Sequence, residues 1–287
     1  MIFETNHSNY KIKDNHDEPL INFKLEDFEK RTSHVYYDHD YWKYTGYKGV
    51  VYTPLDIPKL DIDVDLLWQL WQKHIGVVDI YEGNKQFRVA DPWFDDKTEY
   101  YPKQDMYSSG MEYRNFHLIK NHNFSGYNHI GDEWYPWVTE NFPQIIEHLE
   151  LLPFDNIRWC CFVGRDTHGV HPHYDDYHDI IPKMKDYDPA AIRIRFSKVD
   201  WKNEHFYLTN THGRKRLYPQ LPPETNTFCY DATTNEHGGD RGFKPDYRCQ
   251  LMPYGVLNKD KYFELLERSI HKYKDYVITM DHMNMML

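Results

Sequence analysis

The spacing of apolar and polar positions is clearest in the second half of the chain. Between Glu133 and Pro153, apolar residues recur at the three- and four-residue spacing of an amphipathic helix, namely Val138, Phe142, Ile145, Ile146 and Leu149. We expect this helix to end at or before Leu152, because a proline disfavours helical geometry in the residue before it. A last helix is predicted over Lys259 to Tyr273.

Between these helices lie short apolar segments bounded by Gly, Pro, Asn and Asp, a pattern typical of strands. The segments are IRWCCFVG, AAIRIRFSKV, EHFYLTN, NTFCYD and YRCQLMPYGVL. Several short strands at this spacing favour an antiparallel sandwich or barrel, of which the jelly roll is one form. We therefore predict a mainly β fold with flanking helices.

The first half of the chain carries weaker signals. The segment DVDLLWQLWQKHIG has an apolar face at helical spacing after an acidic cap at Asp63 or Asp65. The stretch from Trp42 to Thr53 indicates irregular structure or short strands. The rest of this half gives no assignment.

Composition favours a folded chain with a packed core and does not favour binding to nucleic acid. Of the 287 residues, 40% are hydrophobic and 17% aromatic, which is enough for a packed core. The 45 acidic residues exceed the 34 basic ones, giving a formal charge of −11, and no basic cluster is long enough to follow a phosphate backbone. Nucleic acid is therefore not favoured as a partner, and oligomeric state is not indicated.

The distribution of cysteines and apolar runs indicates a cytoplasmic protein. Cys160, Cys161, Cys229 and Cys249 form no C-x-x-C pair and fall in strand-like segments, where buried reduced thiols are expected. No apolar run approaches the length of about 18 residues that a membrane helix needs. The first residues lack the pattern of a signal peptide, so secretion is not expected.

One segment, GRDTHGVHPHYDDYHD, carries the most informative pattern. Within it, His173, Tyr174 and Asp175 form an H-x-D triplet. On an extended strand, residues two apart project from the same face, so the imidazole and the carboxylate can converge on one metal ion. A second histidine from a distant strand would complete a 2-His-1-carboxylate triad, which leaves positions on an iron(II) ion open.

His237 is the best candidate for that second histidine. It follows an apolar segment and precedes Gly238 and Gly239, so we expect the chain to turn there. Arg248 stands at the start of the next apolar segment, where it could form a paired contact with the distal carboxylate of 2-oxoglutarate. The order of these elements is a stronger signal than the triplet, which a chain with 18 histidines supplies by chance.

Other residues compete for these roles. His171 shares a face with His173 and is the nearest rival ligand, and Arg241 also follows His237. His148 and Glu150 fit an H-x-E pattern, but they lie on the predicted helix, where residues two apart diverge. These alternatives leave His173 and Asp175 as the pair with the right spacing.

In the order of its segments, the chain resembles the aspartyl/asparaginyl (and prolyl) β-hydroxylase-like branch of the iron(II)/2-oxoglutarate-dependent dioxygenases. There, an amphipathic helix and a Leu-Pro turn lead into a strand and a Gly-containing loop that ends in H-x-D, as in FPQIIEHLELLPFDNIRWCCFVGRDTHGVHPHYD. Farther on, the family has an arginine-bearing strand, an aromatic strand, and a D-x(4–5)-H segment before another arginine-bearing strand. The segments AIRIRFSKVDWKNEHFYL and FCYDATTNEHGGDRGFKPDYRCQL are similar, so the resemblance covers roughly residues 135 to 258.

The resemblance implies a double-stranded β-helix (a cupin-like jelly roll) and an iron(II) site. By position, it makes His173, Asp175 and His237 the iron ligands and Arg248 the anchor of 2-oxoglutarate. It also implies dioxygen as the oxidant. Residues 133–258 would form the catalytic core, residues 1–132 an extension that serves as substrate lid or scaffold, and residues 259–287 a C-terminal helix and tail.

Arg193 and Arg195 match the family's first arginine strand. They are two residues apart and so share a face, and either could contact a carboxylate of cosubstrate or substrate. The chain departs from the family in two places. Gly238 and Gly239 follow the distal histidine, where a polar residue is usual, and Gln250 stands where many relatives have Ser or Thr.

The implied activity is hydroxylation of an unactivated C–H bond in a small amine- or carboxylate-bearing molecule, such as an amino acid. His178 could line the mouth of the pocket, and Trp201 could stack on the substrate, although core packing is the commoner role of such a tryptophan. Three alternatives stay open: a 2-oxoglutarate oxygenase that acts on a protein side chain, a cupin-type metalloenzyme without 2-oxoglutarate, and a β-sandwich binding module.

Overall fold

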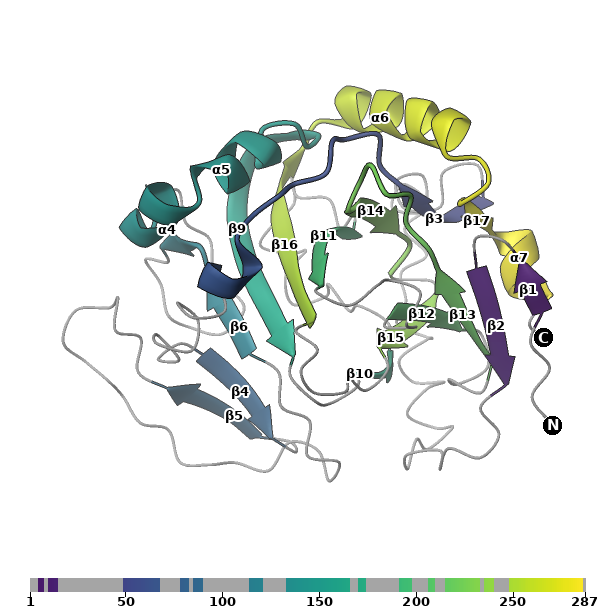
Figure 1. The fold of residues 1–287 in the computed structure, drawn as a ribbon, viewed down its shortest axis with the longest axis horizontal. Helices are drawn as coiled ribbons and strands as arrows, with labels where there is room; N and C mark the ends of the chain where they lie inside the picture. Colours follow the sequence, from purple (N-terminus) through teal and green to yellow (C-terminus); the bar gives the residue numbers. More distant parts are fainter. Residues whose placement is uncertain are drawn as a thin grey trace.

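The computed structural model describes residues 5–7, 10–14, 49–67, 78–82, 85–89, 114–120, 133–165, 170–173, 191–197, 206–209, 215–232, 235–239 and 248–285. For some of these residues, His173 and Arg248 among them, only the backbone is described. Within these ranges the molecule is mostly β, with helices at its flank (Figure 1).

Antiparallel strands form two larger sheets, called sheet A and sheet B. Sheet A has the strand order β1 (Thr5–His7), β2 (Tyr10–Asp14), β13 (Lys215–Pro219), β12 (Phe206–Thr209), β15 (Glu236–Gly239) and β10 (Val170–His173). Sheet B has the order β17 (Ile278–Thr279), β3 (Val50–Pro54), β14 (Thr227–Tyr230), β11 (Ala191–Ser197), β16 (Arg248–Leu257), β9 (Phe154–Arg165) and β6 (Arg114–His117). Two smaller sheets pair β4 (Val78–Glu82) with β5 (Lys85–Val89) and β7 (Ile119–Lys120) with β8 (Glu133–Trp134).

The eight strands from β9 to β16 have the connectivity of a double-stranded β-helix. They pair in a nested series, β9 with β16, β10 with β15, β11 with β14 and β12 with β13, and every pair is antiparallel. The first and third pairs lie in sheet B, and the second and fourth lie in sheet A. Nested pairs that alternate between two facing sheets are the jelly roll, so the predicted fold class is confirmed.

Strands from the first half of the chain extend both sheets of this jelly roll. In sheet A, β2 pairs with β13, and in sheet B, β3 pairs with β14 while β6 pairs with β9. The sequence had indicated only irregular structure or short strands near β3. Its position beside β14 makes the N-terminal residues part of the same sheets as the core strands.

The helices are α4 (Pro136–Asn141), α5 (Pro143–Leu149), α6 (Lys259–Lys272) and α7 (Met280–Asn284). The single helix predicted before Leu152 is therefore two helices. Phe142, between them, has φ −137° and ψ 50°, because the ring of Pro143 disfavours helical geometry in the residue before it. The predicted last helix is confirmed, and the Asn258 side chain caps it by accepting from the Lys261 N–H (3.0 Å).

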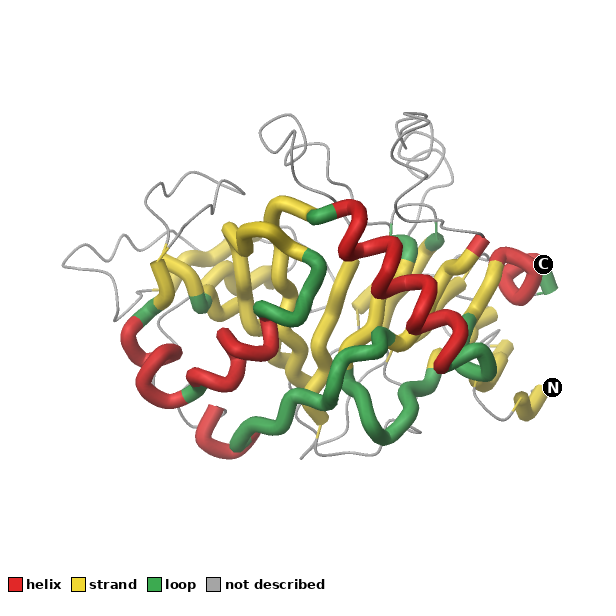
Figure 2. The backbone as a smooth tube through the Cα atoms, turned by 90° about the horizontal axis from the view of Figure 1, so that it is seen from above, coloured by secondary structure: helices red, strands yellow, loops and turns green. Residues whose placement is uncertain are grey.

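The larger hydrophobic core lies between sheet B and the helices α4, α5 and α6, which gather on one side of the strands (Figures 1 and 2). Ile192, Ile194 and Leu251 of sheet B face it, together with Leu149 of α5 and Leu265 of α6. We call this side of sheet B its outer face. Each such buried aliphatic side chain stabilises the fold by about 2 kcal/mol relative to an exposed one.

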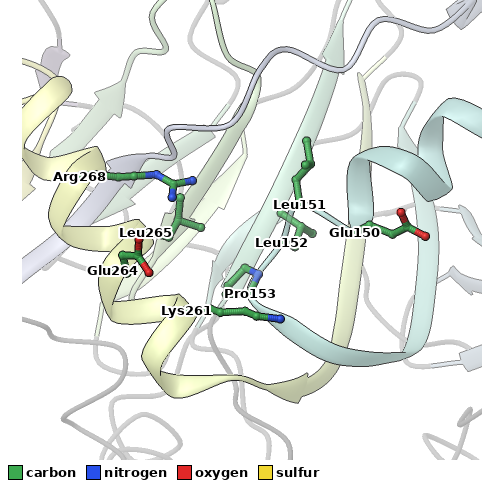
Figure 3. A pocket seen from close by; sticks show the side chains of 8 residues that line it. All are labelled: Glu150, Leu151, Leu152, Pro153, Lys261, Glu264, Leu265 and Arg268. Carbon is green, nitrogen blue, oxygen red and sulfur yellow. The ribbon is translucent and has the colours of Figure 1, made fainter.

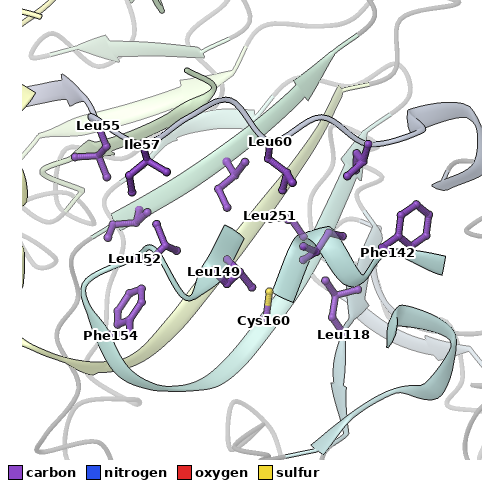
Figure 4. Packing of buried hydrophobic residues seen from close by; sticks show 14 of the residues in the cluster. Leu55, Ile57, Leu60, Leu118, Phe142, Leu149, Leu152, Phe154, Cys160 and Leu251 are labelled. Carbon is purple, nitrogen blue, oxygen red and sulfur yellow. The ribbon is translucent and has the colours of Figure 1, made fainter. Parts of the chain in front are cut away.

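An extended segment, residues 55–62, runs across this outer core and is called the strap. Leu55, Ile57 and Leu60 point from it toward Leu149 and Leu251 (Figure 4). Asn226 holds it in place, because its amide donates to the Leu60 carbonyl and accepts from the Leu60 N–H, both at 3.0 Å. Beyond the strap, residues 64–67 are helical and Asp63 accepts from the Leu66 N–H (2.9 Å), as predicted for one of the two candidate caps.

A second core fills the space between sheets A and B. Its buried residues include Phe206, Leu208 and Leu217 from sheet A and Phe228 and Tyr230 from sheet B. The side of sheet B that faces sheet A is called its inner face. This inner core is rich in aromatic rings, and it forms the wall behind the candidate site.

Two further predictions concern the cysteines and the membrane. Cys160 and Cys229 are buried free thiols, as expected, and burial raises the pKa of the Cys160 thiol, so that it stays protonated. Within the described ranges, no helix has the length and apolar character needed to cross a membrane.

Candidate metal centre

The pair β10–β15 brings the two predicted histidine ligands together in the backbone register. His173 is directly opposite His237, and Val170 is opposite Gly239, so β10 carries one extra residue as a β-bulge. Residues directly opposite each other in an antiparallel pair share a face and have Cα atoms about 5 Å apart. His173, and not its rival His171, therefore holds the position opposite His237.

The Asn235 carbonyl favours the tautomer of His237 that a metal ligand would use. The residue is 4% exposed, and its Nδ1 lies 3.3 Å from the carbonyl oxygen of Asn235. A carbonyl oxygen only accepts hydrogen bonds, so Nδ1 carries the proton and Nε2 keeps its lone pair. Nε2 could then bind a metal ion while Nδ1 is held by the backbone, an arrangement common among metal-binding histidines.

The prediction that the chain turns directly after His237 is wrong. Gly238 and Gly239 continue strand β15, where they lie opposite Tyr207 and Phe206 of β12. Glycine alone is a weak strand former, but large aromatic partners on the neighbouring strand cover the space that its missing side chain leaves. The two glycines therefore lie inside a buried ladder instead of ending it.

The structure describes the other ligand and pocket candidates only in part. Asp175, His178, Trp201 and Arg241 lie outside the described residues, and His171 and His173 are described by their backbone alone. Among the side chains that the structure does describe, no three of the His, Cys, Asp or Glu type converge on one point. The candidate triad thus stands on the register of β10 and β15 and on the H-x-D spacing.

Arg193 lies on the inner face of β11 and is fixed there by several contacts. It is 2% exposed, and its Nη2 donates to the Tyr254 hydroxyl (2.8 Å) while Nη1 donates to the Ile192 carbonyl (3.0 Å). Its Cζ lies 5.6 Å from the ring centroid of Tyr230 and 5.2 Å from that of Tyr254. Such cation–π contacts are stronger where water is excluded.

Arg195 shares this face, as its spacing from Arg193 predicts, but it is only half-buried. Its Cζ lies 5.3 Å from the ring centroid of Phe206 and 5.5 Å from that of Phe228. Burial raises the pKa of nearby Tyr52 well above its ordinary value, and the positive charge of Arg195 opposes that rise. Tyr52 therefore stays a neutral phenol, whose hydroxyl donates to the Gln220 carbonyl (3.2 Å).

The backbone of Arg248 is close to that of Arg195 in sheet B. Position 248 is opposite Ser197, and two residues along each strand Gln250 is opposite Arg195. Because residues alternate between the faces of a strand, position 248 belongs to the same face as Arg195. Diagonal neighbours of this kind are about 7–8 Å apart.

Four aromatic residues line the inner core beside His237, and sequence reasoning did not single them out. These are Tyr52, Phe206, Phe228 and Tyr230, here called the aromatic wall. The imidazole of His237 contacts Tyr230 (ring centroids 4.9 Å apart) and Phe206 (6.3 Å). The alternation of Phe228 and Tyr230 along one strand was the available signal, but aromatic residues in strands usually serve only as core.

A shallow pocket of about 180 Å³ lies on the opposite, helical side of sheet B (Figure 3). Its lining comes from the turn after α5 and from α6, namely Glu150, Leu151, Leu152, Pro153, Lys261, Glu264, Leu265 and Arg268. None of the predicted site residues belongs to it. The candidate centre is therefore the inner face of the jelly roll and not this surface pocket.

Comparison with known proteins gives remote structural likeness only. No family model and no curated protein matches the sequence. A 2OG-Fe(II) oxygenase family protein from Burkholderia pseudomallei has a TM-score of 0.35 at 10% identity, covering 83% of this chain and 93% of its own. A prolyl hydroxylase from Trichoplax adhaerens, solved with a hypoxia inducible factor peptide, has a TM-score of 0.33 at 8% identity, covering 85% and 97%. A 2OG-Fe(II) oxygenase family protein from Caulobacter crescentus has a TM-score of 0.26 at 9% identity, covering 96% and 88%. With TM-scores this low, the fold assignment rests on the strand order of this chain itself.

Proposed function

We propose that the protein is an iron(II)/2-oxoglutarate-dependent dioxygenase that hydroxylates an unactivated C–H bond of a small, amino-acid-like substrate carrying an amine or a carboxylate. His173, Asp175 and His237 would hold the iron, and three coordination positions would stay open for cosubstrate and dioxygen. The observation that supports the proposal most is the register of β10 and β15. Within a jelly roll, it sets His173 of the H-x-D triplet opposite His237.

The bound iron and 2-oxoglutarate would supply the oxidising chemistry, and the protein would supply position and environment. His237 is suited to its part because the Asn235 carbonyl fixes the Nδ1 proton and leaves Nε2 for the metal. The aromatic wall behind the imidazole keeps water from that side of the centre. A dry, fixed surrounding is what an oxidation of an unactivated bond requires.

The arginines of the inner face would bind the organic anions. We propose that Arg248 pairs with the distal carboxylate of 2-oxoglutarate through its planar guanidinium. Of the two arginines on β11, Arg195 is better placed to meet a second carboxylate. Arg193 already donates to Tyr254 and Ile192 and is fully buried, whereas Arg195 keeps part of its surface exposed.

The test is the formation of the iron chelate without oxygen. Wild-type protein with Fe(II) and 2-oxoglutarate should develop the weak visible charge-transfer band of the chelate. His173→Ala and His237→Ala should abolish the band. His171→Ala is the matched control: it should keep the band, because position 171 is not opposite His237.

Two outcomes would contradict the proposal in different ways. Metal binding by wild-type protein without the band, and without succinate formation in air, would indicate a cupin-type metalloenzyme that does not use 2-oxoglutarate. A band that survives His173→Ala but is lost in His171→Ala would move the ligand set by two residues.

A further inference from the structure

We infer that Tyr230 is a positioning residue, which sets the orientation of the His237 imidazole and thereby the affinity of the metal site. The inference rests on the proposed function, because it takes His237 as a metal ligand. Tyr230 belongs to β14 of sheet B, and His237 belongs to β15 of sheet A. The contact between them therefore crosses the interior of the jelly roll.

The contact has the geometry of a favourable aromatic pair. The ring centroids of Tyr230 and His237 are 4.9 Å apart, and the ring planes meet at 67°. Edge-to-face pairs at this distance contribute about 0.5–1.5 kcal/mol beyond the burial of their area. The Tyr230 ring lies against the imidazole and so limits its rotation about the hydrogen bond from Nδ1 to Asn235.

Tyr230 can do this because its own ring is fixed on several sides. Phe206 packs against it edge-to-face (4.9 Å, 61°), and Phe228 stacks on it (5.9 Å, 29°). On another side, the guanidinium of Arg193 lies 5.6 Å from its centroid. Tyr230 is 5% exposed, so a change of its rotamer would need its neighbours to move as well.

Arg193 completes the arrangement by tying the ring to a third strand. Its hydrogen bond to the Tyr254 hydroxyl (2.8 Å) anchors the guanidinium to β16. Strands β16, β11 and β14 of one sheet thus brace a single ring against the histidine of the other sheet. Groups that orient a metal-binding histidine commonly change metal affinity by about 10–100-fold when they are removed.

The experiment measures Zn(II) binding by titration calorimetry in four proteins, with Zn(II) alone as the probe. Tyr230→Leu should bind about tenfold more weakly than wild type, because the edge-to-face contact is lost. Tyr230→Phe keeps the ring and should stay within about threefold of wild type. Phe142→Leu is the matched control, because it removes a fully buried ring of the outer core, on the other face of sheet B from His237, and its affinity should equal that of wild type.

Thermal unfolding of the same variants separates positioning from general stability. Both leucine variants should lower the midpoint of unfolding, but only Tyr230→Leu should weaken Zn(II) binding. Equal Zn(II) affinity in wild type and Tyr230→Leu, or an equal loss in Phe142→Leu, would overturn the inference. Absence of Zn(II) binding in wild type would overturn the proposed centre together with the inference.

A second measurement decides the matter if Tyr230→Leu does not fold. In metal-free wild-type protein, the carbon-bound imidazole protons of His237 should show nuclear Overhauser contacts to the Tyr230 ring and a ring-current shift. Tyr230→Phe should keep both signals. Signals from an imidazole that averages over orientations, without contact to that ring, would overturn the inference.

Discussion

His148 is a buried histidine that plays no part in the candidate centre. It lies on α5 against sheet B, is 6% exposed, and its Nε2 is 3.1 Å from the Thr227 hydroxyl oxygen. Burial lowers the pKa of its imidazole to about 4, because the charged form would lose its hydration. The H-x-E pattern formed with Glu150 is therefore a feature of helix packing, as its position on a predicted helix suggested.

We expect His148 to make the fold sensitive to acid. Between pH 6.5 and about pH 4, His148 is protonated in the unfolded chain but stays neutral in the folded protein. The free energy of unfolding should therefore fall as the pH drops through this window. The loss should be about 3 kcal/mol by pH 4, and none is expected above pH 7. Urea denaturation at a series of pH values measures it.

The matched variant is His148→Gln, which can keep a hydrogen bond to Thr227 but has no titrating group. Between pH 6.5 and 4, its free energy of unfolding should depend less on pH than that of wild type. The difference should equal the loss that protonation of His148 causes in wild type. Parallel pH curves for wild type and variant would show that His148 is not the group responsible.

At the scale of the residue, sequence offered candidate metal ligands but not the residues that would support them. His173, Asp175 and His237 are recognisable as candidates because few residue types bind iron and their spacing suits a strand. Tyr230 and Tyr254 are not recognisable, because their part depends on which rings face each other across two sheets. That information lies in the strand order, which the alternation of a single segment does not carry.

At the scale of the element, the long and strongly patterned segments were predictable. The strands β9, β11, β12, β14 and β16 and the helix α6 all coincide with predicted segments. The strands β13 and β15 were missed for a physical reason. β13 begins with Lys215 and Arg216, and β15 contains two glycines, so their pairing comes from neighbouring strands and not from their own propensity.

A close approach of two backbones makes one position of β16 intolerant of any side chain. At Gly255 the register with β9 shifts, and an added Cβ would collide with the Asn156 carbonyl oxygen and lie 2.8 Å from the Ile157 Cα. Both neighbours are backbone atoms of a paired strand, so neither can move cheaply. We expect Gly255→Ala to lower the free energy of unfolding by about 3 kcal/mol.

Gly49→Ala is the comparison for that change, again by chemical denaturation. Gly49 has φ +72°, but among the described residues no atom beyond its chain neighbours lies within 4 Å of its added Cβ. Only backbone strain should result, costing about 1 kcal/mol. A smaller loss in Gly255→Ala than in Gly49→Ala would mean that the backbones of β9 and β16 separate readily.

At the scale of the whole molecule, the strap and the N-terminal strands are integral to the fold, because they pack against or pair with strands of the jelly roll. The strap contributes to the outer core, and the Leu55 N–H donates to the Thr227 carbonyl of β14 (2.8 Å). On its other side, Asp56 forms ion pairs with Lys272 (2.6 Å) and Arg268 (3.5 Å) of α6. These exposed pairs contribute little, so the strap is held mainly by burial and by Asn226.

We therefore expect the strap to unfold together with the sheets. In native-state hydrogen exchange, the amide of Leu60 in the strap and that of Leu118, which donates to the Cys160 carbonyl of β9 (2.8 Å), should both exchange only through global unfolding, with free energies on the order of 5–15 kcal/mol. The Leu66 amide, bonded to the exposed Asp63 side chain, should exchange much faster. Rapid, denaturant-independent exchange at Leu60 would show that the strap opens by itself.

The nesting of the strand pairs fixes when in folding the two histidines can meet. The β12–β13 pair closes the shortest loop, and each outer pair must close a longer one at a greater cost in chain entropy. The β10–β15 pair is among the later ones, so an early, partly folded chain offers a cation only scattered imidazoles. Under the proposed function, the strands of the jelly roll would therefore pair before the metal is bound, and metal loading would be a late step of maturation.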